Sequence, residues 1–287
     1  MADTISASVG VGGRNQRADV ETIQRLLGRR GFNPGRVDGR CGPKTARAIL
    51  NFQAGFMSRP DGRIDTGGQS WRRLVSAPAM PAGGNASASR PAMAMPAAAP
   101  VPTGNARSDL LTLIPRPSGD LVNRGLVPVS PAFMKQKLGE PRRSYTAECQ
   151  PMTNEKLKAQ VVTASMGRFK VTGLRPAVES LQMALAQVQR ELPEVHSALG
   201  TAGMLCCRLI RGSASAVSNH AWGTAIDFTL NGALDRRGDG RVQLGLSLMA
   251  PIMNQHGWYW GAAFRTEDAM HFEASQGLIL RWASQLG

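Results

Sequence analysis

The stretch that decides the fold is residues 218–227, Ser-Asn-His-Ala-Trp-Gly-Thr-Ala-Ile-Asp, which runs from a turn into an apolar strand. Its first two residues are typical of turns, and Gly223 permits a tight bend that a side chain would block. Residues 224–230 alternate with a period of two, so Asp227 shares one strand face with Ala225. A carboxylate in an apolar strand needs a partner, and a metal ion is one such partner.

A second motif follows at residues 268–273, Asp-Ala-Met-His-Phe-Glu, and predicts another short strand around His271. If the two strands are neighbours in one sheet, His271 lies beside His220 and Asp227. Two neutral imidazoles and one carboxylate, with the further carboxylate of Asp268, are typical of a catalytic zinc site that keeps one position open for water. Two of the four histidines of the chain fall in these motifs, so we expect the three residues to bind zinc.

Together the two motifs resemble the LAS metallopeptidases, the family of D-alanyl-D-alanine carboxypeptidases and L-alanyl-D-glutamate peptidases, from about Leu126 to the C-terminus. The resemblance implies a small α+β fold on an antiparallel sheet and peptidoglycan stem peptides as substrates. It also implies that His220, Asp227 and His271 bind zinc and that Asp268 is the general base. The His-Glu-x-x-His helix of thermolysin-type peptidases is absent from the sequence.

The carboxylate three residues before the last histidine bears on which bond is cut. Relatives that trim D-Ala-D-Ala termini typically have glutamate there, whereas this chain has Asp268, as the L-alanyl-D-glutamate peptidases do. Glu267 is adjacent, but on a strand its side chain would point to the opposite face. We therefore expect Asp268 to be the base and the enzyme to be an endopeptidase. A D-alanyl-D-alanine carboxypeptidase is the first alternative, and a non-catalytic wall-binding protein is the second.

Hydrolysis of an amide passes through a tetrahedral oxyanion, which calls for a cation or hydrogen-bond donor besides the metal. Relatives commonly keep a substrate-site arginine upstream of the first motif, where this chain has Arg208 and Arg211. We expect Arg208 to act in catalysis and Arg211 to bind substrate, together with Ser218. Trp258 and Trp260 alternate to one strand face. Trp260 is a further candidate for substrate binding, with packing in the core as the alternative.

The rest of the C-terminal half contains helical and strand patterns. Apolar residues in the segment 181–192 follow helical spacing until Pro193, and a helix is also expected over 244–254. Residues 204–210 are expected to form a strand. Residues 108–141 have no clear periodicity, so we expect them to wrap irregularly around the domain.

Residues 235–240, Asp-Arg-Arg-Gly-Asp-Gly, are similar to a calcium-binding loop. Two arginines stand where oxygen ligands belong, and the carboxylates are too few for calcium. We interpret this segment as a turn.

The N-terminal part predicts a separate helical module. Apolar residues between Val20 and Leu27 form a helical stripe, and a second helix is expected to bury Ile49 and its neighbours. A third short helix would contain Leu74. Residues 6–75 resemble the three-helix peptidoglycan-binding module, with a generic helical bundle as the alternative.

The composition predicts three segments, which are a module at 1–75, a linker at 76–107 and a zinc peptidase domain at 108–287. The linker is rich in Ala, Pro, Met, Gly and Ser, with almost no charge, so we expect it to act as a tether rather than a core. Prolines interrupt its apolar residues, so a transmembrane segment is not expected. The net charge of +14 suits an anionic cell wall, and scattered basic residues without interleaved aromatic residues do not indicate nucleic acid binding.

The N-terminus has neither a basic start nor an apolar signal segment. We therefore expect synthesis in the cytoplasm and non-classical delivery to the periplasm or cell wall, either as a phage endolysin or as an effector. A secretion machine or an immunity protein would then be a further partner. Among the cysteines, Cys149 is able to pair with Cys206 or Cys207 in an oxidising compartment, and buried free thiols are the alternative.

Overall fold

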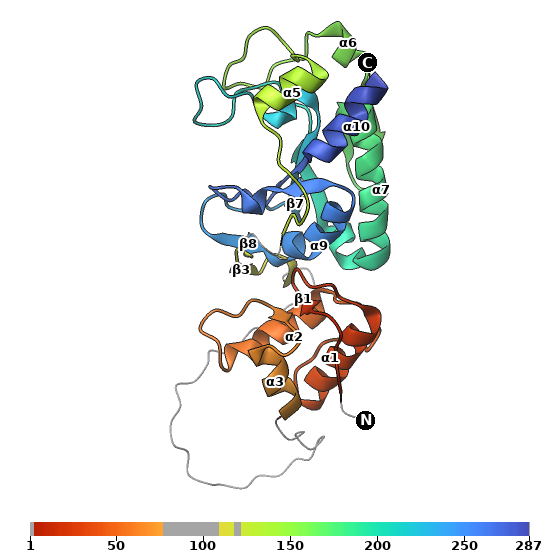
Figure 1. Ribbon diagram of the computed structural model, residues 1–287, viewed down its shortest axis with the longest axis vertical. Helices are drawn as coiled ribbons and strands as arrows, with labels where there is room; N and C mark the ends of the chain where they lie inside the picture. The colour runs from red at the N-terminus through yellow and green to blue at the C-terminus, as the bar shows by residue number, and fades with distance from the viewer. Residues whose placement is uncertain (1–2, 77–108, 118–121, 287) are drawn as a thin grey trace.

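The computed structural model describes residues 3–76, 109–117 and 122–286 (Figure 1). Figure 1 shows the N-terminal module, coloured red to orange, at one end of the molecule and the C-terminal domain at the other. Apart from Ser76, the expected linker lies outside the described residues. No helix among the described ranges combines the length and the apolar character that a membrane crossing needs.

The module contains the three expected helices, which are α1 (Arg17–Arg29), α2 (Pro43–Ala54) and α3 (Gln69–Ser76). Two short strands, β1 (Val9–Gly10) and β2 (Arg63–Ile64), pair antiparallel beside them. The apolar stripes of the helices meet in one core, and the central side chains are fully buried, as predicted. These buried residues are Val20, Ile23, Leu27, Ile49, Ile64 and Leu74.

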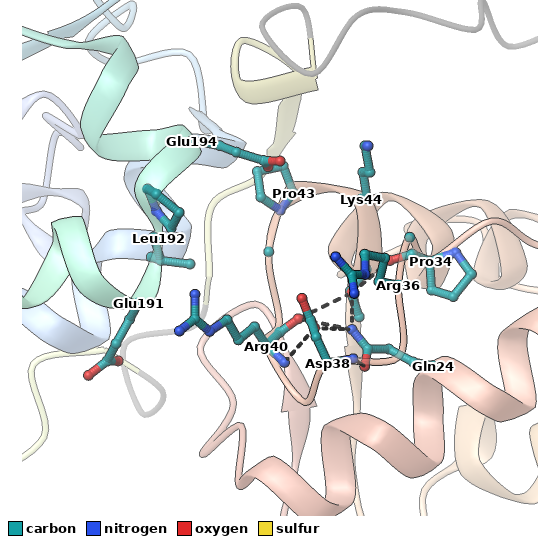
Figure 2. A pocket seen from close by; sticks show the side chains of 14 residues that line it. Gln24, Pro34, Arg36, Asp38, Arg40, Pro43, Lys44, Glu191, Leu192 and Glu194 are labelled. Carbon is teal, nitrogen blue, oxygen red and sulfur yellow. Dashed lines mark hydrogen bonds between the residues drawn. The ribbon is translucent and has the colours of Figure 1, made fainter.

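Two Asp-Gly-Arg turns in the module, residues 38–40 and 61–63, are held by buried glutamines in the same way. The amide of Gln24 donates to the Asp38 carboxylate at 3.1 Å, and its oxygen accepts from the Asp38 main-chain N–H at 3.1 Å (Figure 2). Gln53 makes the corresponding bonds to the turn at 61–63. Both glutamines are fully buried, and the turns provide the hydrogen-bond partners that their buried amide groups need.

The module packs against the C-terminal domain through α2, which contacts α9 (Leu244–Gln255). Arg47 on α2 donates to the Thr112 hydroxyl at 2.6 Å and lies 3.5 Å from the Asp109 carboxylate. Three buried side chains of the module join the core of the C-terminal domain rather than that of the module. They are Val11, Ala46 and Leu50.

The centre of the C-terminal domain is a four-stranded antiparallel sheet in the order β6-β7-β10-β9. Its strands are β6 (Leu199–Gly203), β7 (Ala225–Leu230), β10 (His271–Ala274) and β9 (Trp258–Trp260). Two antiparallel pairs lie outside it, formed by β4 (Val161–Ser165) with β5 (Lys170–Leu174) and by β3 (Leu113–Pro115) with β8 (Arg241–Gln243). The expected α+β class with an antiparallel sheet is confirmed.

Two helices pack on each other beside this sheet, namely α7 (Arg175–Glu191) and α9. The helix α7 ends just before Pro193, which begins α8 (Pro193–Ala198), as the sequence predicts, and α7 also has a proline in its first turn. The C-terminal helix α10 (Gln276–Leu286) contacts α5 (Pro131–Leu138), and a short helix α6 (Glu155–Lys158) precedes β4.

The sheet has one apolar face and one polar face, because strand alternation and register agree. Ile226 and Phe228 of β7, Phe272 of β10 and the two tryptophans of β9 share the apolar face, and all five are fully buried. Asp227, His271 and Glu273 lie on the other face. The sheet thereby covers the domain core with one side and presents ionisable groups on the other.

Two local expectations were wrong. Residues 204–210 are not a strand, because regular pairing ends at Gly203, whose φ is +132°, and the following main-chain N–H groups bond to several different segments. Within the segment expected to be irregular, Pro131 begins helix α5, and the Ser130 side chain caps it by accepting from the Phe133 N–H. A serine followed by proline was the missed signal.

Candidate functional site

His220 is placed by a short helical turn and a glycine. The 3-10 turn η2 (Asn219–Trp222) is capped by the Ser218 hydroxyl, which accepts from the His220 N–H at 3.4 Å. It ends at Gly223 with φ of +65°, where a Cβ atom would lie 2.8 Å from the Cα of Gly173. Only glycine tolerates both conditions, so this bend fixes where His220 sits relative to the start of β7.

Asp227 and His271 are brought together by strand register. They are direct partners on the antiparallel strands β7 and β10, so their side chains leave the sheet on the same face. The main-chain oxygen of Met204, just after β6, lies 3.0 Å from Nδ1 of His220 and orients that ring from the other side. Neighbouring strands thus assemble the three residues, as the sequence predicts.

The three candidate ligand atoms form a compact triangle. Nε2 of His220 lies 3.2 Å from Nδ1 of His271, and Oδ1 of Asp227 lies 3.0 Å from the His271 atom and 3.3 Å from the His220 atom. Atoms bound to zinc in tetrahedral geometry at about 2.0–2.2 Å are about 3.3–3.5 Å apart. The three atoms need to move apart only slightly to surround one ion. The donor set of two imidazoles and one carboxylate suits zinc.

The protonation of this triangle is strongly perturbed. Burial opposes the charged form of Asp227, but hydrogen bonds with His220 and His271 hold the pKa of Asp227 well below its usual range. Burial likewise lowers the pKa of His271, but hydrogen bonds to Asp227 and Glu273 outweigh it and raise the pKa of His271 to about 10. The two carboxylates on either side of the His271 ring therefore favour its protonated form.

Asp268 lies beside the triangle in the turn before β10, and 23% of its side chain is exposed. Its Oδ2 is 3.5 Å from Nε of Arg237, whereas its buried Oδ1 has no hydrogen-bond partner among the described residues. Burial raises the pKa of Asp268, with Asp227 adding to the effect and His271 and Arg237 opposing it. A carboxylate with a free oxygen and a raised pKa is suited to general base catalysis.

The neighbouring carboxylate has a different role. Glu267 is buried, and its Oε1 accepts from the Asp239 N–H at 2.7 Å, while its main-chain oxygen accepts from Gly238. Glu267 thus holds the turn at 235–240 and does not line the cleft that contains Asp268. The premise that 267 and 268 alternate on a strand was wrong, because both precede β10.

The triangle opens into a cleft of about 730 Å³. Arg208, Arg211 and Ser218 line it, so the structure brings these predicted residues to the same cleft as the candidate ligands and Asp268. A smaller cleft of about 190 Å³ lies between the module and α8, with Arg40 and Glu191 among its lining residues (Figure 2). The cleft of about 730 Å³ contains the candidate ligands and Asp268, so it is the candidate active site.

Trp260 does not line this cleft, which corrects its expected role in substrate binding. It is fully buried, it stacks on Phe272 with ring centroids 6.0 Å apart, and its indole N–H donates to the Ala269 main-chain oxygen at 2.7 Å. The register pairs Trp260 with Phe272, which puts both on the sheet face opposite His271. The prediction that Trp258 and Trp260 share one strand face was correct, but this face packs in the core.

Two side chains of the site had no role assigned from the sequence, and the sequence had left open whether Cys149 pairs with Cys206, with Cys207 or with neither. Arg237 comes from the segment interpreted only as a turn, and Glu273, quoted within the second motif, had received no role. Cys149 pairs with Cys206 in a disulfide, and both residues line the cleft. Cys206 also donates its main-chain N–H to the His220 oxygen at 3.0 Å, which ties the disulfide to a candidate ligand.

The buried carboxyl group of Asp235 makes the stability of the folded state depend on pH. Its Oδ2 accepts from the Gln243 N–H at 2.6 Å, and its buried Oδ1 has no partner among the described residues. Burial, reinforced by Asp239, Glu267 and Asp268, raises the pKa of Asp235 to about 6. The folded state therefore binds more protons than the unfolded state between pH about 4 and 6, and its stability falls as pH rises through that window.

Replacing Asp235 with asparagine is expected to remove this loss and to raise the free energy of unfolding at pH 7.5 by about 1–3 kcal/mol, with little change near pH 4. Urea denaturation at both pH values measures it. Glu194→Gln, at an exposed carboxylate of the same domain that does not contribute to the raised pKa of Asp235, is the control. A variant that is less stable than the wild type at pH 7.5 would contradict the prediction.

Comparison with known families agrees with this geometry. Residues 211–274 match the family model described as D-alanyl-D-alanine carboxypeptidase, and residues 16–67 match the model described as putative peptidoglycan binding domain. Neither curated proteins nor solved structures give a significant match to the chain. The first match contains His220, Asp227, Asp268 and His271, and the second covers α1 and α2. Two segments of the chain are thus similar to known families, the N-terminal one to peptidoglycan-binding domains and the C-terminal one to D-alanyl-D-alanine carboxypeptidases.

Proposed function

We propose that this peptidase is a zinc-dependent endopeptidase that cleaves amide bonds within peptidoglycan stem peptides. The observation that carries the proposal is the triangle of His220, Asp227 and His271, whose edges suit one tetrahedral ion, with Asp268 lining the same cleft. Such a set provides three ligands and one base, which is the composition of a hydrolytic zinc site.

The residues divide the chemistry among them. When bound, zinc would supply a Lewis acid and lower the pKa of a water molecule. The Asp268 carboxylate accepts a proton from the attacking water and later delivers it to the leaving amine. Arg237, 3.5 Å from Oδ2 of Asp268, keeps the carboxylate oriented during both transfers.

Arg208 is the proposed donor to the tetrahedral oxyanion. It is partly buried in the cleft wall, and its Nη1 donates to the Leu209 oxygen at 2.9 Å, which limits its motion. Burial and the nearby Arg211 lower the pKa of Arg208, while Asp227 and Asp268 oppose this. A guanidinium held in place in a partly desolvated cleft stabilises developing negative charge better than a mobile one.

The N-terminal domain is proposed to hold the enzyme on the wall, which raises its effective concentration at an insoluble substrate. The Cys149–Cys206 disulfide is typical of a protein that works in an oxidising compartment. It supports the proposal that the chain acts in the periplasm or cell wall, as an endolysin or as an effector.

The scissile bond is tested with a soluble pentapeptide stem that ends in D-Ala-D-Ala, supplied with a free or an amidated C-terminus. The zinc-loaded full chain is expected to cut both peptides internally at similar rates, because an endopeptidase does not need the terminal carboxylate. Mass spectrometry of the products identifies the bond, and Asp268→Asn is the inactive control.

The alternative activity has its own outcome. A D-alanyl-D-alanine carboxypeptidase would hold the terminal carboxylate, for which Arg208 and Arg211 line the cleft. Release of free D-Ala from the unblocked peptide alone, with no internal cut, would overturn the endopeptidase and support this alternative. Zinc-loaded protein that cleaves neither peptide nor isolated sacculi would contradict both and favour a wall-binding role.

A further inference from the structure

A buried carboxylate lies directly behind one of the candidate zinc ligands. Glu273 is two residues after His271 on β10, so both side chains leave the same sheet face, and only 2% of Glu273 is exposed. Its Oε2 lies 3.1 Å from Nε2 of His271, on the ring edge opposite the nitrogen that faces Asp227. The mechanism proposed above gives Glu273 no part in proton transfer.

The contact decides which nitrogen of His271 faces a metal. A carboxylate only accepts, so Nε2 of His271 holds the proton of the neutral ring and Nδ1 keeps its lone pair for the ion. His220 is fixed in the opposite sense, because its Nδ1 lies 3.0 Å from the Met204 oxygen and its Nε2 points into the triangle. Each ring thus has an outer acceptor, but only that of His271 is a carboxylate.

Asn219 holds this carboxylate in position. Its amide Nδ2 donates to the same Oε2 of Glu273 at 2.7 Å, and Asn219 immediately precedes His220 in η2. The bond therefore joins the two chain segments that carry the histidine ligands. Because one oxygen accepts from both Asn219 and His271, the placement of Glu273 and the orientation of the His271 ring are coupled.

The geometry points to Glu273, oriented by Asn219, as a positioning residue that fixes the metal-binding tautomer of His271 and adds a second negative charge behind the ion. The inference rests on the proposed zinc site. Asp227 alone neutralises half of a divalent charge, and a carboxylate behind the imidazole adds to this without occupying the position that water needs. Partners of this kind typically change metal affinity by about 10–100-fold.

Three substitutions in the full chain separate charge from orientation. In Glu273→Gln the amide oxygen is able to accept from both His271 and Asn219, so only the charge is lost, and we expect zinc to bind about 10-fold more weakly. Glu273→Ala also loses the acceptor and should bind about 100-fold more weakly, whereas Asn219→Ala, which loses only the orienting bond, should lie close to Glu273→Gln. Competition with a chromogenic chelator measures the zinc affinities.

Glu267→Gln is the matched control, because it makes the same change at an equally buried glutamate that contacts none of the candidate ligands in any recorded bond. Its zinc affinity should equal that of the wild type. Loading with cobalt gives a second readout, since the visible absorption of Co²⁺ reports ligand geometry. Glu273→Ala should change that spectrum, while Glu267→Gln should leave it as in the wild type.

The outcomes distinguish this inference from the proposed function. Wild-type zinc affinity and an unchanged cobalt spectrum in Glu273→Ala would overturn the inference while leaving the zinc peptidase intact. The same loss of affinity in Glu267→Gln would also overturn it, because the effect would then reflect general destabilisation. A wild-type chain that binds no zinc would instead overturn the proposed function itself.

Discussion

His220→Ala is expected to lose bound zinc and hydrolysis together. Nε2 of His220 is one corner of the triangle with His271 and Asp227, so its removal leaves two protein ligands. Four-ligand zinc sites have apparent binding free energies of about 10–16 kcal/mol, or about 3 kcal/mol for each ligand, so affinity should fall by a factor of roughly 100. Elemental analysis after dialysis and hydrolysis of a soluble stem peptide measure the two losses.

Asp268→Asn should separate the two properties that His220→Ala loses together. Asp268 is outside the triangle, so zinc should remain bound, while kcat falls by roughly 100- to 10,000-fold because the base is lost. Glu267→Gln should keep both zinc and turnover, since its carboxylate serves the turn at 235–240.

Two results would contradict this assignment. Full zinc occupancy in His220→Ala would show that the ion is held by other residues. If Glu267→Gln were the inactive variant and Asp268→Asn retained turnover, the wrong carboxylate would have been chosen as the base.

The candidate ligands could be predicted from the sequence because the local sequence around them determines the bends and strand faces that place them. Gly223 supplies the bend after His220, and period-two alternation puts Asp227 on the polar face of β7. What the sequence could not supply is the register between β7 and β10, which makes Asp227 and His271 direct partners. Register depends on contacts between strands that are about 40 residues apart in the chain, so only the resemblance to a family supported their proximity.

The same dependence explains the error at Trp260. Alternation correctly grouped Trp258 with Trp260, but the choice between core and cleft needed the pairing of β9 with β10. Phe272 was a usable signal, since its neighbours His271 and Glu273 in the second motif are polar and must face away from it. Once Trp260 is paired with Phe272, its place in the core follows.

Asp268 was selected for a reason that does not hold, although the residue does line the cleft. The segment before β10 is a turn, so strand alternation does not separate Asp268 from Glu267. The separation comes from hydrogen bonding, because main-chain N–H groups of the 235–240 turn occupy Glu267 and leave Oδ1 of Asp268 free. Partners that lie about 30 residues away are not visible to a local pattern.

The contact between the two domains was likewise absent from the sequence prediction, which treated the module as a freely tethered unit. Helical spacing on α2 identifies Ala46, Ile49 and Leu50 as apolar, but not that they serve different cores. Ile49 packs within the module, whereas Ala46 and Leu50 belong to the core of the peptidase domain. A helix with an apolar stripe this wide is able to pack on two sides.

A chain that begins at Ser108 is therefore expected to fold but to be less stable than the peptidase domain within the full chain. Removing the module exposes the apolar side chains that Leu50 and Ala46 cover. The free energy of unfolding should fall by roughly 2–4 kcal/mol as a result. For a domain of about 180 residues this corresponds to a decrease in Tm of roughly 5–10 °C. Thermal unfolding followed by circular dichroism measures it.

Below that Tm the shortened chain should cleave a soluble stem peptide at nearly the rate of the full chain, because every candidate ligand, Asp268 and Arg208 lie in the peptidase domain. It should lose binding to isolated sacculi and much of its rate on them, since the module that we propose to bind the wall is gone. Unchanged binding to sacculi would remove the wall-binding role from the module.

A single substitution tests the contact without shortening the chain. Arg47→Ala removes the hydrogen bond to Thr112 and the ion pair with Asp109, both of which are largely buried, and should lower Tm more than Arg72→Ala. Arg72 is the matched control because it is an exposed arginine on α3 of the same module and makes no recorded side-chain bond among the described residues. Equal Tm values for the two variants, together with an unchanged Tm in the chain that begins at Ser108, would show that the module does not stabilise the peptidase domain in solution.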